Sequence, residues 1–167
     1  MTVNYVDGDL FTLLPKTNEP KYVPHVVNNI GRMGSGFALA AMTHYPVVRE
    51  DYLRWFEATE LSHELKNPFQ LGKTQFVVVQ ATPTIVICNM VAQSGLIGSN
   101  NPKPIKYAAL LQCMTQVAEN IRICCGTAAS IHAPMFGSAL AGGKWELIQE
   151  LIEECWRDFP VTIYRLG

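Results

Sequence analysis

Apolar and polar residues follow two different periods along this chain, and the two periods predict strands and helices in alternation. The predicted strands are residues 3–6, 22–27, 76–80, 84–90, 130–135 and 161–166. The predicted helices are residues 35–42, 47–60, 105–121 and 144–159, with a short helical piece at 10–14. This alternation is typical of α/β proteins, in which helices cover both faces of a sheet. We therefore expect a three-layer α/β/α fold with a mixed, largely parallel sheet of about six strands.

Length and composition place the chain among globular domains. It has 167 residues, of which 49% are hydrophobic and 16% charged, and its net charge is −1. No repeat or linker divides it, so we expect residues 1–167 to form one domain. The chain has no long basic run to hold nucleic acid and no apolar run of the ~18 residues that span a membrane. With no signal peptide at the N-terminus, we expect a cytoplasmic monomer without nucleic-acid or membrane partners.

The cysteines and histidines do not have the spacing of a metal site. The cysteines are odd in number and irregularly spaced, so we expect reduced core residues. They are Cys88, Cys113, Cys124, Cys125 and Cys155, and the histidines are His25, His44, His63 and His132. Since no pair has the spacing of zinc ligands, we predict neither a metal nor a cofactor.

Two glycine-rich loops each connect a predicted strand to a predicted helix. The first loop is residues 28–36 and the second loop is residues 137–143. Small residues allow backbone N–H groups to approach an anion, and the dipole of the following helix favours negative charge there. Two such loops in one small chain predict two phosphates, so a nucleotide bridged by a diphosphate is the expected ligand. In α/β folds such ligands lie beyond the carboxyl ends of the strands.

Two common nucleotide-binding motifs do not fit these loops. Gly137 and Gly142 have the spacing of a Walker A motif, but Gly143 takes the place of its lysine and no Ser or Thr is placed to hold Mg²⁺. The first loop has the spacing G-x-x-G-x-G, which is the reverse of the dinucleotide-binding fingerprint. The sequence therefore favours neither an NTPase nor a Rossmann oxidoreductase.

The loops, in this order, resemble the macrodomain family of ADP-ribose-binding modules. Residues 6–10 look like the opening G-D-[IL] signature, residues 25–38 like the first phosphate loop and residues 137–145 like the second. Residues 161–166 are similar to the closing strand, so the resemblance covers nearly the whole chain.

Within the family, the chain is most similar to the branch that contains the yeast-type ADP-ribose-1''-phosphate phosphatases and the terminal ADP-ribose–protein glycohydrolases. The similarity lies in a histidine before the first loop, in an Arg-Met-Gly-x-Gly run and in a Tyr-Pro…Asp-Tyr segment. These are His25, Arg32–Gly36, Tyr45-Pro46 and Asp51-Tyr52.

The resemblance implies binding roles, each with a structural alternative. Asp9 would accept a hydrogen bond from the adenine amino group, although it is also placed to cap a helix. Leu166 would pack on the adenine or serve as a core leucine, and Asn28 would contact the distal ribose or cap a turn. The implied ligand-binding residues are Asp9, Leu10, Asn28, Met33, Gly34, Ser35, Gly36, Phe37, Met135, Phe136, Gly137, Ser138, Ala139, Leu140, Ala141 and Leu166.

Catalytic residues are harder to assign. The glycohydrolase members use a lysine near the end of the central strand and an aspartate in the second loop. Here residues 89–93 contain no lysine, and Ala141 stands at the aspartate position. His25, Asn28 and Asp51 are the remaining candidates for moving a proton or orienting water. The structural alternatives are a core histidine for His25 and a solvated helix residue for Asp51. Strand alternation places His25 and Asn28 on opposite faces, which weakens a joint role.

From these residues we predict a hydrolase that removes the phosphate from ADP-ribose 1''-phosphate. Such a reaction needs a held phosphate, a positioned water and a proton for the leaving oxygen. A non-catalytic reader of ADP-ribose or of ADP-ribosylated protein is one alternative. The other alternative is de-esterification of a modified ADP-ribose.

Overall fold

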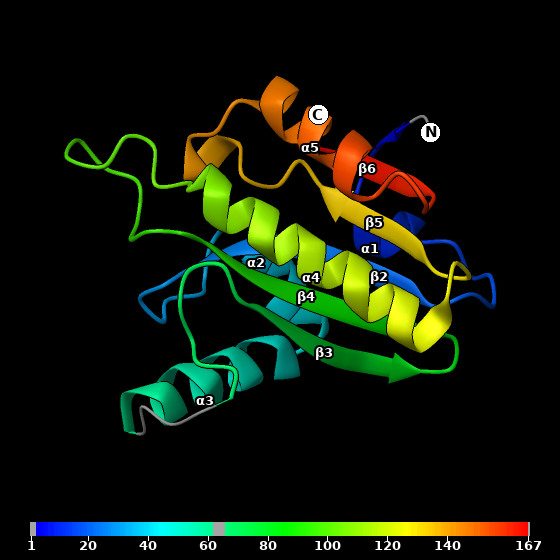
Figure 1. Cartoon of the computed structure of the whole chain (residues 1–167), viewed down its shortest axis with the longest axis horizontal. Coiled ribbons are helices and arrows are strands. Elements are labelled where there is room, and N and C mark those ends of the chain that lie inside the picture. The colour runs from blue at the N-terminus through cyan, green and yellow to red at the C-terminus, as the bar shows by residue number, and fades with distance from the viewer. Residues whose placement is uncertain (1–2, 62–65, 167) are drawn as a thin grey trace.

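The computed structural model describes residues 3–61 and 66–166, and in them strands and helices alternate as the sequence predicts (Figure 1). His63 lies outside the described residues. The strands are β1 (Asn4–Asp7), β2 (Lys21–Asn28), β3 (Thr74–Ala81), β4 (Thr84–Gln93), β5 (Ser130–Pro134) and β6 (Val161–Arg165). The helices are α1 (Leu10–Leu13), α2 (Gly36–His44), α3 (Val47–Leu61), α4 (Tyr107–Cys125) and α5 (Trp145–Cys155), and η1 (Ala139–Ala141) is a short 3₁₀ turn.

The strands of the described residues form one mixed sheet in the order β1-β6-β5-β2-β4-β3. Neighbouring strands are parallel except β3, which runs antiparallel to β4 at one edge. The predicted largely parallel sheet is therefore confirmed. β4 lies inside the sheet and is buried along almost its whole length, as its nearly continuous apolar sequence predicts.

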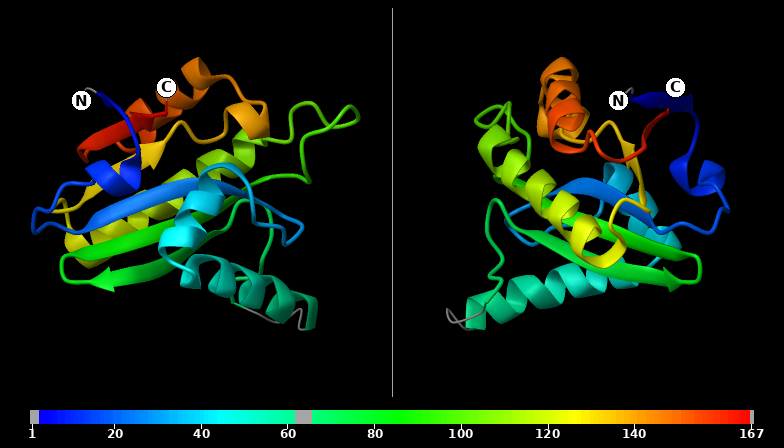
Figure 2. Two further views of the ribbon diagram at one scale, coloured as in Figure 1. Left: turned by 180° about the vertical axis from the view of Figure 1, so that it is seen from behind. Right: turned by 45° about the vertical axis from the view of Figure 1, so that its right-hand side comes forward.

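Helices cover both faces of the sheet, which confirms the three predicted layers (Figure 2). α4 and α5 pack on one face, around a core that includes Leu110, Met114 and Ile152. α1, α2 and α3 cover the other face, where the core includes Val48 and Tyr52. α4 and α5 bury apolar stripes against the sheet, and the inner strands β2, β4 and β5 are largely buried between the layers.

Every helix differs from its predicted bounds by at least one residue, and α4 and α5 differ most. α4 begins at Tyr107 because Ile105 instead forms a bridge with Gln93 and donates its N–H to the oxygen of Ala141. α4 ends before Gly126, which has a left-handed backbone (φ 66°). The helix predicted over 144–159 ends at Cys155, and its last apolar residues fill the core from a turn.

The five cysteines are all free thiols, as predicted. Only Cys88 and Cys113 are buried core residues. The core prediction is wrong for Cys124, which is exposed near the end of α4, while Cys125 and Cys155 are half-buried. No helix among residues 3–61 and 66–166 is long and apolar enough to cross a membrane.

Candidate functional site

A cleft of about 700 Å³ opens at the carboxyl ends of β2, β4 and β5. Its walls include both glycine-rich loops, and its volume is in the range of small-molecule sites. Both loops therefore lie beyond the carboxyl ends of the strands, which is where α/β folds bind their ligands. All the predicted site residues line this cleft except Asp9, Leu10, Asp51 and Leu166.

The first loop is shaped by Asn28 at the end of β2. Its Oδ1 accepts from the N–H groups of Ile30 and Arg32, both at 3.2 Å, and its Nδ2 donates to the oxygen of Arg32 at 2.5 Å. Tyr52 adds an O–H bond to the same Oδ1 at 2.8 Å. Asn28 thus caps a turn, as one of its two predicted roles requires, while it also lines the cleft.

One face of α3 supports the first loop from behind. Arg49 Nε donates to the oxygen of Met33 at 3.2 Å, and Tyr52 donates to Asn28 one turn later. Phe56 lies against Gly31, where a Cβ atom would come within 2.7 Å of its ring. Residues three and four apart on a helix share a face, so this support follows from the spacing of the three side chains.

The amino end of α2 completes the first loop. Ser35 is the N-cap residue in an extended conformation, and its side chain forms no capping hydrogen bond. Within the described residues, the N–H groups of Gly34, Ser35 and Gly36 have no protein acceptor. A helix of nine residues whose first N–H groups are free is a favourable place for an anion.

The second loop is held by its own hydrogen bonds. Ser138 Oγ donates to the oxygen of Met135 at 2.6 Å, and the N–H of Gly143 donates to the oxygen of Gly137 at 2.8 Å. A Cβ atom at Gly143 would collide with that oxygen, so the turn requires glycine. In the described part of the chain, the N–H groups of residues 137–140 have no protein acceptor. The loop is therefore rigid and presents several donors.

The backbone of the second loop also contains an unusual alanine. Ala139 has a φ of 49°, in the left-handed region that favours glycine. A non-glycine residue there costs on the order of 1–2 kcal/mol. Strain of this kind is common in binding loops, where the surrounding structure holds the backbone in place.

The two loops meet across the cleft. Gly36 of the first loop has a left-handed backbone (φ 59°), and a Cβ atom there would lie 3.1 Å from Leu140 of the second loop. Donors from both loops therefore border one space. This is the arrangement that the two-phosphate prediction requires.

The charged residues that line the cleft are Arg32 and Arg49. Among the described lining residues there is no Asp, Glu or Lys. Neither arginine belongs to an ion pair within residues 3–61 and 66–166. The cleft thus offers free N–H groups and unpaired guanidinium groups, which favour an anionic ligand.

His25 lies at the inner wall of the cleft and is 2% exposed. Its Nε2 is 2.6 Å from Asn89 Oδ1, while Asn89 Nδ2 donates to Gln75 Oε1 at 3.0 Å. Because Asn89 presents an oxygen, the ring proton is on Nε2 and Nδ1 is an acceptor. Nδ1 is the buried polar side-chain atom of the described residues that has no partner. Burial lowers the pKa of His25 to about 4, so the ring is neutral near pH 7.

Strand alternation predicted opposite faces for His25 and Asn28, and this prediction is wrong. The ring of His25 lies 5.5 Å from that of Phe37 in α2, and Asn28 bonds to Tyr52 in α3. Both side chains therefore contact the same helical layer. At this point Val27 pairs with Val91 and Asn28 with Gln93, so the regular pairing of β2 with β4 is interrupted before Asn28, the last residue of β2.

Three predicted ligand-binding residues lie outside the cleft. Asp9 is the N-cap of α1, with its oxygens accepting from Phe11 N at 3.2 Å and Thr12 Oγ1 at 2.8 Å. Leu10 is buried under α1, whereas Leu166 is 79% exposed rather than a core leucine. The helix-cap alternative for Asp9 is therefore confirmed.

Asp51, a predicted catalytic candidate, also lies outside the cleft. Its carboxylate pairs with Arg54 at 3.3 Å on the surface of α3, as expected of a solvated helix residue. Sequence reasoning missed Arg49, Gln93, Leu96 and Ile97, which line the cleft. Gln93, Leu96 and Ile97 lie in or beside the Gly-, Ser- and Asn-rich stretch after β4, and that position was the available clue.

Solved structures resemble this fold over nearly its whole length. A protein of unknown function from Bacteroides thetaiotaomicron is 34% identical, covers 99% of each chain and has a TM-score of 0.85. A macrodomain protein from Streptomyces coelicolor is 32% identical, with 99% of this chain and 100% of that chain covered and a TM-score of 0.79. This chain belongs to the macrodomain family.

A more distant structure extends the comparison for this macrodomain. DarTG from Thermosipho africanus, solved in complex with ADP-ribose, is 16% identical over 97% of this chain and 41% of that chain, with a TM-score of 0.71. At this identity the likeness shows the fold alone. No family model and no curated protein matches the sequence.

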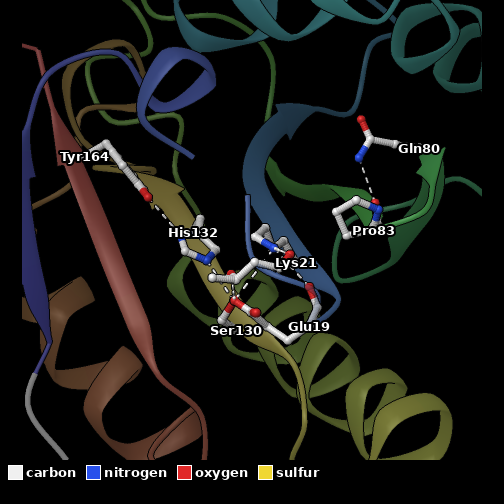
Figure 3. Close-up of polar contacts among 8 residues, drawn as sticks. Glu19, Lys21, Gln80, Pro83, Ser130, His132 and Tyr164 are labelled. Carbon is white, nitrogen blue, oxygen red and sulfur yellow. Dashed lines mark hydrogen bonds and ion pairs between the residues drawn. The ribbon is translucent and has the colours of Figure 1, made fainter. Parts of the chain in front are cut away.

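This macrodomain has a second buried polar cluster, which we call the polar chain (Figure 3). It consists of Tyr164, His132, Ser130, Glu19 and Lys21. Tyr164 Oη lies 2.9 Å from His132 Nδ1, and His132 Nε2 lies 2.8 Å from Ser130 Oγ. Ser130 then donates to the carboxylate of Glu19 at 3.3 Å, and Glu19 faces Lys21 Nζ at 3.7 Å.

The proton positions in the polar chain follow from Glu19. A carboxylate only accepts, so the single proton of Ser130 points to Glu19 and Ser130 accepts from His132 Nε2. His132 Nδ1 then accepts from Tyr164. Because every proton has an acceptor, His132 does not activate Ser130 as a nucleophile. Within the described residues, no group of three or more His, Cys, Asp or Glu side chains could hold a metal ion.

Proposed function

We propose that this macrodomain binds an ADP-ribose derivative in the cleft and removes the phosphate from ADP-ribose 1''-phosphate. The observation that carries the proposal is the pair of facing loops with free N–H groups, in a cleft whose charged residues are two arginines. Such a site suits a ligand with several phosphates. The Thermosipho africanus protein with this fold binds ADP-ribose, which supports the ligand class.

We place the ligand with its diphosphate between the two loops and its distal ribose beside Asn28. The adenine would lie toward Asp9, Leu10 and Leu166. The cap that Asp9 forms on α1 is compatible with this role, because each carboxylate oxygen has two lone pairs and accepts one bond in the protein. The likeness to the Streptomyces coelicolor protein over 99% of this chain supports our proposal that residues 1–167 form one macrodomain.

In the proposed reaction, a water molecule attacks phosphorus and the bond from phosphorus to the anomeric oxygen breaks. His25 Nδ1, an unpartnered acceptor at the cleft wall, would take the proton from the water. The sugar oxygen leaves and takes a proton from a second water molecule, to which His25 returns the proton that it accepted, so the products are ADP-ribose and phosphate. The cleft lining has no lysine or aspartate among the described residues, which favours this reaction over lysine-linked glycohydrolysis.

A second candidate is a non-catalytic reader of ADP-ribose. It is favoured by the protonation state of His25. The ring is buried and neutral near pH 7, and its single proton faces Asn89, so His25 has no proton to give to the leaving oxygen. Among the described lining residues there is no carboxylic acid or lysine to protonate the leaving oxygen. A reader needs only the loops and the arginines.

The test is phosphate release from ADP-ribose 1''-phosphate by the wild-type protein and by the variants His25→Ala, Asn28→Ala and Asp51→Asn. Binding of ADP-ribose to the same samples would be measured by calorimetry. We expect release by the wild type and by Asp51→Asn, and loss of release in His25→Ala with binding retained. Binding without release would establish the reader, and release of acetate from acetylated ADP-ribose instead would establish de-esterification.

A further inference from the structure

Arg32 and Arg49 come from different elements but lie at the same end of the cleft. Arg32 is in the first loop, and its backbone oxygen accepts from Asn28 Nδ2. Arg49 is in the first turn of α3, one turn before Tyr52, which donates to Asn28. Both arginines are therefore close to the residue placed beside the distal ribose. Neither is close in the chain to the residues placed at the adenine.

The two guanidinium groups are available to a ligand. Both residues are exposed and line the cleft. In the described part of the chain, the ion pairs of arginine involve Arg54, Arg122 and Arg165 instead. With no acidic residue among the described lining residues, the two positive charges are not neutralised within the cleft.

Arg49 is also oriented by the protein. Its Nε donates to the oxygen of Met33 at 3.2 Å, which fixes one edge of the guanidinium group against the first loop. The other N–H groups of the Arg49 guanidinium lie in one plane and can bind two phosphate oxygens at once. A cation held at the loop in this way is suited to an anion bound beside the loop.

We propose that Arg32 and Arg49 form an anion subsite at the distal ribose, which selects ADP-ribose derivatives with a phosphate on that ribose over ADP-ribose itself. The loops hold the diphosphate through backbone N–H groups, and the arginines hold the additional phosphate. The proposal rests on the proposed function, because it requires the diphosphate to lie between the two loops.

The experiment compares the affinity of the protein for ADP-ribose and for the phosphonate analogue of ADP-ribose 1''-phosphate, in which a methylene group prevents hydrolysis. Calorimetry on the wild-type protein should show tighter binding of the analogue, by roughly five- to tenfold. Arg32→Gln and Arg49→Gln should each lower the affinity for the analogue by more than they lower the affinity for ADP-ribose, and so remove most of this preference. Higher salt should reduce the preference of the wild type.

Two further variants separate charge from other effects. Arg54→Gln removes a cation from the same helix, where it pairs with Asp51 outside the cleft, and should leave the preference unchanged. Arg49→Lys keeps the positive charge but lacks the planar guanidinium group. We therefore expect its preference for the analogue to lie between those of the wild type and Arg49→Gln.

The possible outcomes are distinct. If ADP-ribose does not bind, the proposed function fails and the subsite fails with it. If ADP-ribose binds but the wild type has equal affinity for both ligands, or both Gln variants keep the preference, only the subsite is overturned.

Discussion

His25 and His132 are both buried histidines on strands of one sheet, yet their surroundings differ in one respect. Burial lowers the pKa of each to about 4. In His132 both ring nitrogens have protein partners, whereas in His25 Nδ1 has none. Both ring nitrogens of the histidine in the polar chain are therefore satisfied, whereas Nδ1 of the histidine at the cleft wall is buried without a protein partner. A buried polar group without a partner is costly, and this cost is why we propose a role for His25.

The same contrast applies to the backbone. The cleft contains free N–H groups in both loops and an alanine with a left-handed conformation at Ala139. In the polar chain each proton of Tyr164, His132 and Ser130 has an acceptor. Unsatisfied groups and strain are thus concentrated at one site, while the second cluster stabilises the fold.

The largest expected effect is on turnover. His25→Ala should lower phosphate release by about 100-fold or more, because it removes the group that accepts the proton. His132→Ala should change turnover by less than about threefold, because the polar chain does not line the cleft. Initial rates at saturating substrate, measured on folded samples, would check both values. Equal losses in the two variants would contradict the distinction between the histidines.

The second effect is on stability, where we expect His132→Ala to be more damaging than His25→Ala. His132→Ala should lower the free energy of unfolding by about 3 kcal/mol, because it opens a cavity and leaves Tyr164 and Ser130 without their partner. His25→Ala should cost less, because it leaves only Asn89 without a partner. Urea unfolding followed by circular dichroism would compare them. The polar chain would not be a stabilising element if His132→Ala were the milder variant.

The third effect is the pH dependence of stability. The pKa of each histidine is ~6.5 in the unfolded chain and about 4 in the folded chain, so as the pH falls the unfolded chain takes up the proton at a higher pH than the folded chain. The wild-type protein should therefore keep its full stability above pH ~6.5 and lose a few kcal/mol as the pH falls toward 4. His132→Ala should lose less over this window, since one of the two groups is absent. Unfolding midpoints at several pH values would test this, and a parallel profile in the variant would argue against it.

The smallest effect tests strain in the second loop. Ala139→Gly should raise the free energy of unfolding by less than about 1 kcal/mol, because glycine adopts the left-handed conformation without a clash. The change Gly143→Ala should destabilise the loop, because a Cβ atom there would collide with the oxygen of Gly137. Thermal unfolding of both variants would measure the difference. A destabilising Ala139→Gly would show that entropy of the unfolded chain outweighs the strain.

The sequence predicted the elements and the loops better than the partners of individual residues. The periods of two and 3.6 gave every strand and helix close to its observed place, and the small residues of the two loops located the cleft. Helix ends were less certain. The helix predicted to 159 ends at Cys155, because Trp156 and Phe159 fill the core from a turn.

Residues that meet from distant parts of the chain were not predictable. Arg49 lines the cleft because α3 packs behind the first loop, and the polar chain joins residues up to 145 positions apart, from Glu19 to Tyr164. The contact of Asn28 with Tyr52, at the end of β2 where the pairing with β4 is irregular, was not predictable either. Each of these depends on packing between elements rather than on local pattern.

By itself, the sequence determined the layered α/β fold and two glycine-rich loops, because backbone periodicity and glycine content are local properties. The tertiary structure alone decided which side chains face the cleft and which are satisfied elsewhere. His25 and His132 illustrate the difference, since both are histidines within apolar strands in the sequence. Only the neighbours that folding brings to them, Asn89 for His25 and the polar chain for His132, decide which ring nitrogen is left without a protein partner.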